Sequence, residues 1–299
     1  MRSLIAYYLD RFRFAGAADF ISMGLGIEAR YRRCRSAWEP HLRLTREFIE
    51  RALSETPKGS KVAVLGAGRL LDVPVERLQD LDGELHLFDA DPGCRWSWRR
   101  LSHGRTRVIP HILDLTGSIE RWTTTLKDKV GSVGAAPEEI TKILDSLTAG
   151  GSPELKGFDA IISVNLLSQI PIYWRDRVES LLGPEFTAHP GAAAALERSY
   201  NRLQGAHRDI LCASKAPCVV VITDEKFFYY RSDIAPWQEE RSLYVDAHQL
   251  PGYSITREDS WYWHIIPQGI EERDFGSIHA VRAIEFEREG GGAAYGAAS

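Results

Sequence analysis

Two glycines, Gly66 and Gly68, follow a short apolar run and could bring a ligand close to the protein backbone. Gly66 permits a tight turn, and Gly68 removes the side chain that would hold a ligand away. Asp89 ends a second apolar run, 21 residues after Gly68. An acid at that spacing can accept hydrogen bonds from ribose hydroxyls. The pattern predicts a nucleotide-like ligand over Gly66, Ala67 and Gly68, although a purely structural turn would show the same glycines.

Other acidic residues could also contact the ligand, or could instead cap a helix. Asp91 lies in the turn after Asp89 and is an alternative partner for a ribose. Asp114 ends a third apolar run, where it could reach an adenine amino group or cap a helix that starts near Thr116. Asp72 is expected to cap the helix after the glycine turn, with Pro74 in its first turn.

A polar segment after a fourth apolar run supplies candidates for orienting a substrate. Asn165 and Gln169 are four residues apart and would share one face if a helix starts there. Either amide could hydrogen-bond a substrate, or the pair could satisfy backbone groups of the loop. Asp224 directly follows a fifth apolar run and is the best-placed acid there.

The elements that would position these residues alternate between strands and helices. Such alternation predicts an α/β fold with a doubly wound, mostly parallel sheet. The expected strands are 62–65, 85–88, 107–113, 158–164 and 218–223, with 277–286 and a weaker 254–266 after them. Helices are expected at 118–130, at 137–148 and over much of 171–215.

The chain is expected to divide into a helical extension, residues 1–57, that covers the site, and a Rossmann-like domain, residues 58–287. A helical insertion is expected near 117–157, and the Gly- and Ala-rich residues 288–299 are expected to be disordered. The first helix carries Leu4, Ile5, Tyr8, Leu9 and Phe12 on one face. That face could lie on a membrane, but packing against the chain's own domain is favoured.

Composition narrows the function classes. The formal net charge of −4 argues against a general nucleic-acid binder. No apolar run approaches the roughly 20 residues that span a bilayer. The four cysteines show no zinc-binding spacing, so we expect reduced thiols, no metal and a cytoplasmic protein.

The chain resembles the class I S-adenosylmethionine-dependent methyltransferases over roughly residues 60–225. The matching pieces are Val-Leu-Gly-Ala-Gly at 64–68, Leu-Phe-Asp at 87–89, Leu-Asp-Leu at 113–115 and Phe-Asp-Ala-Ile-Ile-Ser-Val-Asn at 158–165. The resemblance implies a seven-stranded sheet with a reversed last hairpin strand. It also implies S-adenosylmethionine, with Gly66 and Gly68 at its methionine part, Asp89 at the ribose, Asp114 at the adenine and Asn165 beside the methyl group.

Two departures from the family pattern stand out. Val64 replaces a frequent acid and Leu70 replaces a third glycine, which would favour a noncatalytic binding protein with the same fold. A nicotinamide-dependent oxidoreductase is a further alternative. The dinucleotide pattern, however, would need a glycine at Leu71.

The resemblance leads to expectations about the methyl acceptor. Alignment by Asn165 and Gln169 could suffice for a good nucleophile, whereas a hydroxyl acceptor would need a base. Base candidates are Asp224, His41, His111, His207 and His264. We expect a small, anionic acceptor under a basic and aromatic cover, with Arg32, Trp38, His41 and Trp174 in contact with it. A solvated helix surface anchored by Trp38 is the alternative.

Overall fold

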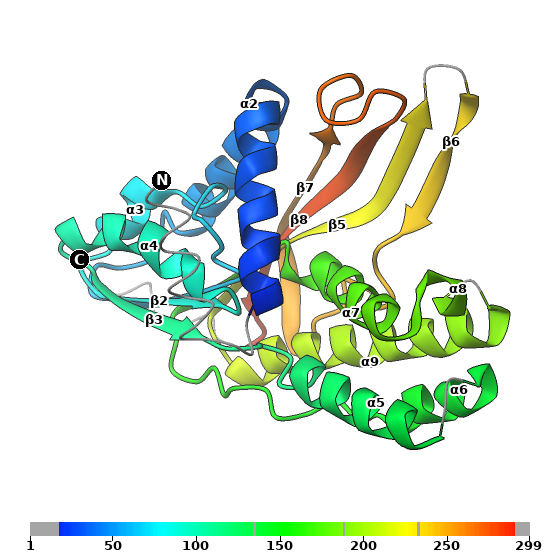
Figure 1. Cartoon of the computed structure of the whole chain (residues 1–299). Helices are drawn as coiled ribbons and strands as arrows, with labels where there is room; N and C mark the ends of the chain where they lie inside the picture. The colour runs from blue at the N-terminus through cyan, green and yellow to red at the C-terminus, as the bar shows by residue number, and fades with distance from the viewer. Residues whose placement is uncertain (1–17, 134–135, 188, 232–233, 291–299) are drawn as a thin grey trace.

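The computed structural model describes residues 18–133, 136–187, 189–231 and 234–290. One twisted sheet runs through the molecule, with strand order β3-β2-β1-β4-β5-β8-β7 and with β6 paired to β5 (Figure 1). The expectations for the first helix face, Leu4 to Phe12, and for the end of the 288–299 tail lie outside the described residues.

Five strands of the sheet are mutually parallel, as the continuous apolar runs predict. They are β1 (Lys61–Leu65), β2 (Glu84–Asp89), β3 (Arg107–Ile112), β4 (Ala160–Val164) and the first part of β5 (Cys218–Arg231). β1 and β4 are buried almost throughout. The order changes direction at β1 and β4, so the carboxyl ends of these strands form the switch point where such sheets bind ligands.

Three further strands complete the sheet. β8 (Gly276–Arg288) pairs antiparallel with β5, and β7 (Tyr253–Ile266) pairs antiparallel with β8. This is the reversed strand that the family resemblance implies, and the doubly wound fold class is confirmed. The predicted strand number of seven is one short, because β6 (Ile234–Arg241) pairs with an extension of β5 beyond the sequence-predicted run.

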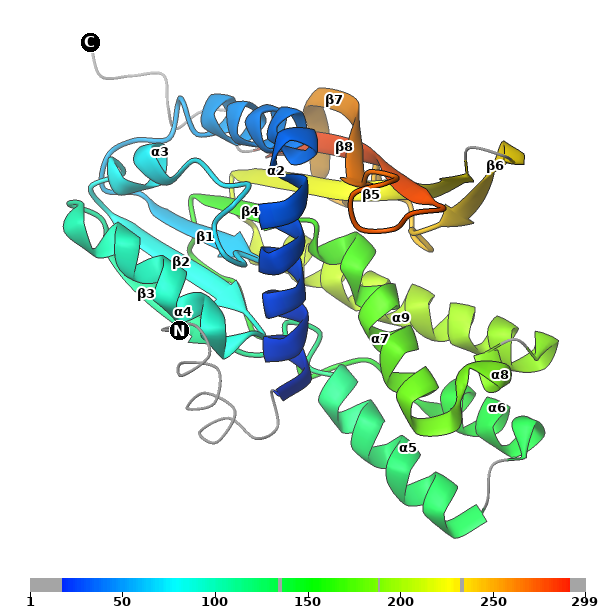
Figure 2. The same cartoon turned by 45° about the horizontal axis from the view of Figure 1, so that its top comes forward.

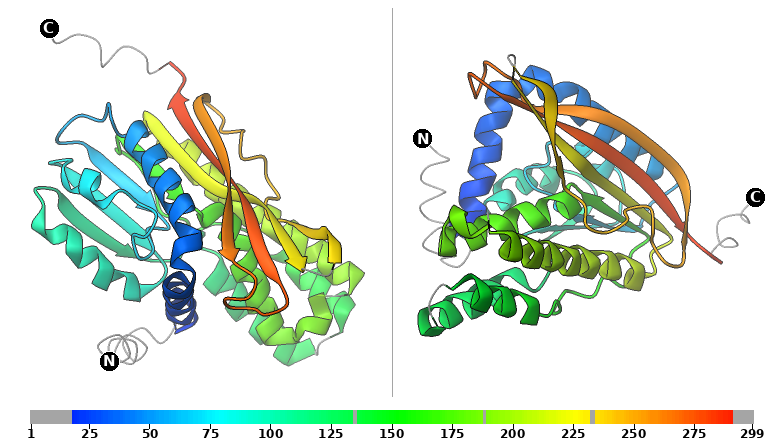
Figure 3. Two further views of the ribbon diagram at one scale, coloured as in Figure 1. Left: turned by 90° about the horizontal axis from the view of Figure 1, so that it is seen from above. Right: turned by 90° about the vertical axis from the view of Figure 1, so that its right-hand side faces the viewer.

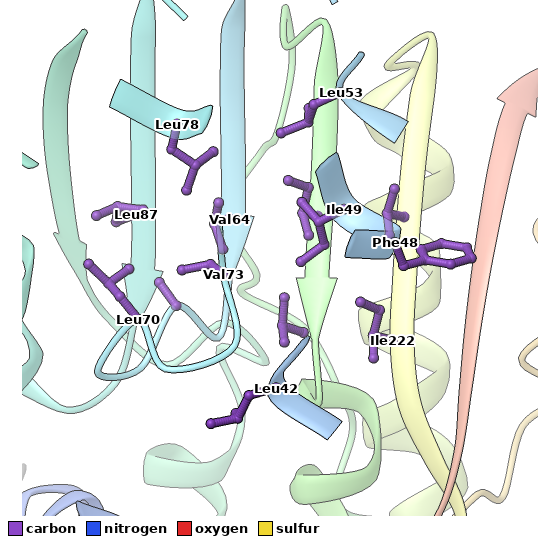
Figure 4. Close-up of a cluster of buried hydrophobic side chains, with 14 of the residues drawn as sticks. Leu42, Phe48, Ile49, Leu53, Val64, Leu70, Val73, Leu78, Leu87 and Ile222 are labelled. Atoms are coloured by element: carbon purple, nitrogen blue, oxygen red, sulfur yellow. The ribbon is translucent and has the colours of Figure 1, made fainter. Parts of the chain in front are cut away.

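Helix α2 (Ala18–Ala52) packs its second half on one face of the sheet. The helix continues through Pro40 and is kinked at Cys34, which has the non-helical angles φ −104° and ψ 18°. In Figure 4, Leu42, Ile49 and Leu53 of α2 lie over the strands with Val64 and Leu87 below them. This apolar layer also includes the short helix α3 (Val75–Gln79) and the segment α4 (Arg95–Trp98) with flanking 3-10 turns at Pro92–Cys94 and Arg99–His103.

The opposite face of the sheet packs against α9 (Pro190–Ser214), so the sheet lies between α2 and α9 (Figure 3). A third apolar cluster joins helices α5 (Ile119–Val133), α6 (Pro137–Ser146), α7 (Leu166–Leu182), α8 (Pro184–Thr187) and α9. The insertion after β3 therefore packs on the helices that follow β4, beside the sheet (Figure 2). None of the helices among the described residues is long and apolar enough to cross a membrane.

Candidate functional site

The predicted site residues lie at the carboxyl ends of four neighbouring strands of the sheet. The glycine turn follows β1, Asp89 ends β2, Asn165 follows β4 and Asp224 lies in β5 just beyond its parallel part. Because these strands are adjacent in the order β2-β1-β4-β5, their carboxyl ends form one continuous row. The first half of α2 reaches this row: a side chain on Gly24 would collide with Asp91, the residue two positions beyond β2.

The two glycines of the turn differ in what surrounds them. Both have positive φ, +72° at Gly66 and +49° at Gly68. A Cβ on Gly66 would lie 2.8 Å from the Val164 carbonyl oxygen, so the fold itself requires glycine there. A Cβ on Gly68 would come no closer than 3.8 Å to the surrounding protein atoms. Gly68 therefore leaves space that a ligand could use.

Leu70 takes the place of the family's third glycine but keeps a left-handed backbone, with φ +60°. This conformation costs a non-glycine residue about 1 kcal/mol. The Leu70 side chain is buried in the same apolar cluster, near Leu87 and Val73, and this burial offsets that cost (Figure 4). Residue 70 therefore has a backbone conformation that favours glycine, although it is a leucine.

Asp89 is joined directly to the glycine turn. Its Oδ2 accepts a hydrogen bond from the Gly68 amide at 2.8 Å, and its Oδ1 accepts one from the Asp91 amide at 2.8 Å. Desolvation raises the pKa of Asp89 to about 6. Asp91 itself accepts from the Gly93 amide and pairs with Arg69 at 2.9 Å. Of the two competing acids, Asp89 is thus the one held against the glycine turn.

Asp72 has a different role from the predicted one. Helix α3 begins at Val75 with Pro74 in the capping position and has no side-chain cap, so the capping prediction for Asp72 is wrong. Asp72 instead lies opposite Asn165, whose Nδ2 donates to its Oδ2 at 3.1 Å. Desolvation raises the pKa of the Asp72 carboxyl to about 6, with the charge of Asp89 contributing in the same direction.

Asn165 occupies a strained position before α7. Its backbone is left-handed, with φ 53°, and its amide donates to the Ile222 carbonyl oxygen at 2.7 Å. The side chain is buried, and its Oδ1 has no hydrogen-bond partner among the described residues. A buried amide oxygen without a donor is costly, so this atom is a candidate for contact with a ligand.

Two other predicted residues are placed differently. Asp114 accepts from the Thr116 amide and hydroxyl and from the Ile119 amide at 3.0 Å, so it caps the start of α5. An adenine contact of Asp114 stays a prediction. Gln169 lies one turn after Asn165, but its side chain is exposed whereas that of Asn165 is buried. The Gln169 side chain therefore does not share the buried surroundings of Asn165, and a role for Gln169 in orienting a substrate stays a prediction.

Asp224 lies in a buried polar cluster. Its Oδ2 accepts from the Ser168 hydroxyl at 3.1 Å and lies 3.2 Å from Nδ1 of His279 on β8. His41 of α2 lies in the same surroundings, because Trp263 stacks on His41 and also packs edge-on against His279. Sequence reasoning missed His279, although a histidine within an apolar strand was a usable signal.

The other histidine candidates lie elsewhere. His207 is fully buried on α9, where Nε2 contacts the Ser163 hydroxyl at 2.9 Å, and desolvation lowers its pKa to about 4. His111 contacts His86 on the neighbouring strand at 2.9 Å, and His264 is exposed on β7. Of the five proposed bases, only Asp224 and His41 come together.

The predicted cover residues have mainly structural contacts. Trp38 is buried, donates to the Ile265 carbonyl oxygen at 2.9 Å and packs edge-on against Trp263. Trp174 is fully buried in the helical cluster and donates to Ser199, so the expectation that it meets the substrate is corrected. Arg32 is largely exposed and pairs with Glu28, and its contact with an anionic substrate stays a prediction.

No protein-family model matches the chain, and no curated protein matches its sequence. Solved structures give weak likenesses. Magnesium protoporphyrin IX methyltransferase from Synechocystis with bound S-adenosylmethionine has a TM-score of 0.43 and 12% identity, covering 95% of this chain and 97% of that one. 1,6-Didemethyltoxoflavin-N1-methyltransferase from Burkholderia thailandensis has a TM-score of 0.41 and 12% identity, with 93% and 89% covered. The function is therefore inferred from the chain's own residues.

Proposed function

We propose that this chain is a methyltransferase that uses S-adenosylmethionine and acts on a small-molecule acceptor. The observation that carries the proposal is the row formed by Gly68, Asp89, Asp72 and Asn165 at the switch point of the sheet. It combines an open glycine, two acids of raised pKa and an unpartnered buried amide oxygen. Acidic residues with raised pKa values, grouped at the carboxyl ends of the strands, favour a ligand site over a structural turn.

These residues fit the parts of S-adenosylmethionine. Gly66, Ala67 and Gly68 would lie along its methionine part, and Asp89 would accept from the ribose hydroxyls, with Asp114 nearest the adenine. Asp72 offers a carboxylate to the ammonium group, which would return its pKa towards the usual range. When bound, the cofactor supplies a methyl group on a positively charged sulfur. Asn165 would orient the groups that react beside it.

Calorimetric titration with S-adenosylmethionine, S-adenosylhomocysteine and NAD tests the proposal. Micromolar binding of both sulfur compounds and none of NAD would support it. Binding of NAD alone would favour the oxidoreductase, and no binding of the sulfur compounds would overturn the proposal. Asp89→Ala should weaken binding while leaving the fold intact, and Asp80→Ala, on an exposed residue, is the matched control.

A further inference from the structure

The cluster of Asp224, His279, His41 and Ser168 lies where β5, β8, α2 and α7 meet. The Asp224 side chain is 3% exposed and the His279 side chain 10% exposed. The backbone around the acid is also fixed, because the Ser242 hydroxyl donates to the Asp224 carbonyl oxygen at 2.7 Å. An acid and an imidazole are thus held side by side, almost out of contact with bulk water.

Hydrogen bonding within this cluster is incomplete. Asp224 Oδ1, His279 Nδ1 and His41 Nε2 are buried and have no hydrogen-bond partner among the described residues, although His279 Nδ1 lies 3.2 Å from Asp224 Oδ2. Buried polar atoms in native proteins are nearly always satisfied. His279 Nδ1 faces the Asp224 carboxylate, so Asp224 Oδ1 and His41 Nε2 are the two atoms that point to a polar ligand.

His41 acts as a donor in this cluster and not as a base. Its Nδ1 accepts from the Trp261 indole at 3.0 Å, so the ring proton of the neutral form lies on Nε2, the unpartnered atom. Desolvation lowers the pKa of His41 to about 3, which keeps the ring neutral at physiological pH. His41 can therefore donate a hydrogen bond to an acceptor but cannot take a proton from it.

Aromatic rings enclose the two histidines. Trp263 stacks on His41 at 4.1 Å between ring centroids, and it also packs edge-on against His279 at 5.5 Å. Phe227 lies 4.2 Å from His279. The titratable groups near the His279 ring are thus Asp224 from β5 and His41 from α2, and Trp263 and Phe227 pack against the ring. Asp224 is the group that can balance a positive charge on His279.

Ser168 connects this cluster to the proposed cofactor site. Its hydroxyl lies 3.1 Å from the Asn165 carbonyl oxygen and 3.1 Å from Asp224 Oδ2. Asn165 is the residue placed beside the methyl group under the proposed function. A single side chain therefore separates that residue from the acid of the Asp224–His279 pair.

We propose that His279 is the catalytic residue that accepts the proton of the methyl acceptor, with Asp224 as its positioning residue, and that the acceptor is a hydroxyl compound. The inference rests on the proposed function. A hydroxyl oxygen attacks the methyl carbon, the carbon–sulfur bond breaks and its electron pair stays on sulfur. The hydroxyl proton passes to His279, whose positive charge is balanced by Asp224. A neutral amine or a thiol has less need of such a base, whereas a hydroxyl requires one.

The test records the imidazole signals of His279 by NMR in isotope-labelled protein, assigned by comparison with His279→Gln. Two ligands are compared, S-adenosylhomocysteine and S-adenosylmethionine, which differ by one methyl group and one positive charge. If His279 faces the methyl group, its imidazole signals should differ between the two complexes, because the added positive charge lies next to the ring. His248, exposed and paired with Glu258, is the control and should give the same signals in both complexes.

The outcomes separate the two proposals. If both ligands bind but the His279 signals are the same in the two complexes, the base assignment is overturned and the proposed function stands. If neither ligand binds, both are overturned. Asp224→Asn should change the His279 Nδ1 signal in either complex, because the carboxylate 3.2 Å from that atom is lost. An unchanged Nδ1 signal in that variant would remove the positioning role of Asp224.

Discussion

The Asn165 side chain donates a hydrogen bond to Asp72 at 3.1 Å across 93 residues of sequence, and this contact joins the loop after β4 to the glycine turn after β1. Asp72 has a raised pKa, and Asn165 has an unpartnered Oδ1 and a left-handed backbone. Strain and incomplete hydrogen bonding at one contact are typical of a binding site. The contact therefore marks Asp72 as a candidate ligand-binding residue.

Replacing the Asp72 carboxylate should weaken ligand binding more than folding. Asp72→Asn keeps the shape of the side chain but removes the charge that would pair with the cofactor's ammonium group. We expect the affinity for S-adenosylhomocysteine to fall about tenfold, the value of one charged hydrogen bond. Calorimetry measures it, with Asp80→Asn as the exposed control. Equal affinity in both variants would show that Asp72 does not contact the ligand.

The raised pKa values of Asp72 and Asp89 predict opposite effects of pH on binding and on stability. Ligand binding favours the ionised acids, so the affinity for S-adenosylhomocysteine should be constant above pH 7 and fall as the pH drops through about 6.

Stability of the ligand-free protein should change the other way. Both acids have folded-state pKa values above their ordinary value of 3.8, so the unfolded chain releases these protons first as the pH rises. The contribution of these two groups to stability therefore falls as the pH rises from about 4 to about 6. Denaturant unfolding of the wild type and of Asp72→Asn at pH 5 and pH 7 measures how much Asp72 contributes to the pH dependence of the free energy of unfolding. An identical pH response in both proteins would contradict the raised pKa of Asp72.

The two glycines of the turn should respond differently to substitution by alanine. Gly66→Ala places a Cβ 2.8 Å from the Val164 carbonyl oxygen, so we expect a loss of more than about 1 kcal/mol of stability from strain alone. Gly68→Ala meets no protein atom closer than 3.8 Å and should cost only about 1 kcal/mol, while its methyl group obstructs the ligand. Thermal unfolding and calorimetry together distinguish them. Normal ligand affinity in folded Gly68→Ala would place the ligand elsewhere.

The sequence predicted the secondary structure best where the local pattern of apolar residues determines the element. The parallel strands were predictable because runs such as Val62–Leu65 are buried on both faces and are therefore apolar throughout. β6 was not, because Gln238, Glu239 and Glu240 make an edge strand look like a loop. Helix α2 continues through Pro40, where packing on the sheet outweighs the local preference to end the helix.

The candidate site was predictable only in part. The positions of Asp89 and Asn165 at the carboxyl ends of neighbouring strands were predictable, because Asp89 ends one buried strand and Asn165 directly follows another. Asp72 was assigned the wrong role and His279 was missed, because their contacts with Asn165 and with Asp224 are tertiary contacts that no local spacing encodes. Asp114 shows the converse, since the capping role offered by its local sequence is the one seen in the structure.

Trp38 was predicted either to contact the substrate or to anchor the helical cover, and stability measurements separate the two. The side chain is 1% exposed and donates a hydrogen bond to the carbonyl oxygen of Ile265 on β7. As an anchor, Trp38→Ala should lower the free energy of unfolding by about 3–5 kcal/mol. Trp38→Phe keeps an aromatic ring but removes the hydrogen bond to Ile265. The loss of this hydrogen bond should lower the free energy of unfolding by about 1 kcal/mol. Trp96→Ala is the control, because Trp96 is 45% exposed and should cost much less. A Trp38→Ala protein as stable as that control would leave substrate contact as the reason for this tryptophan.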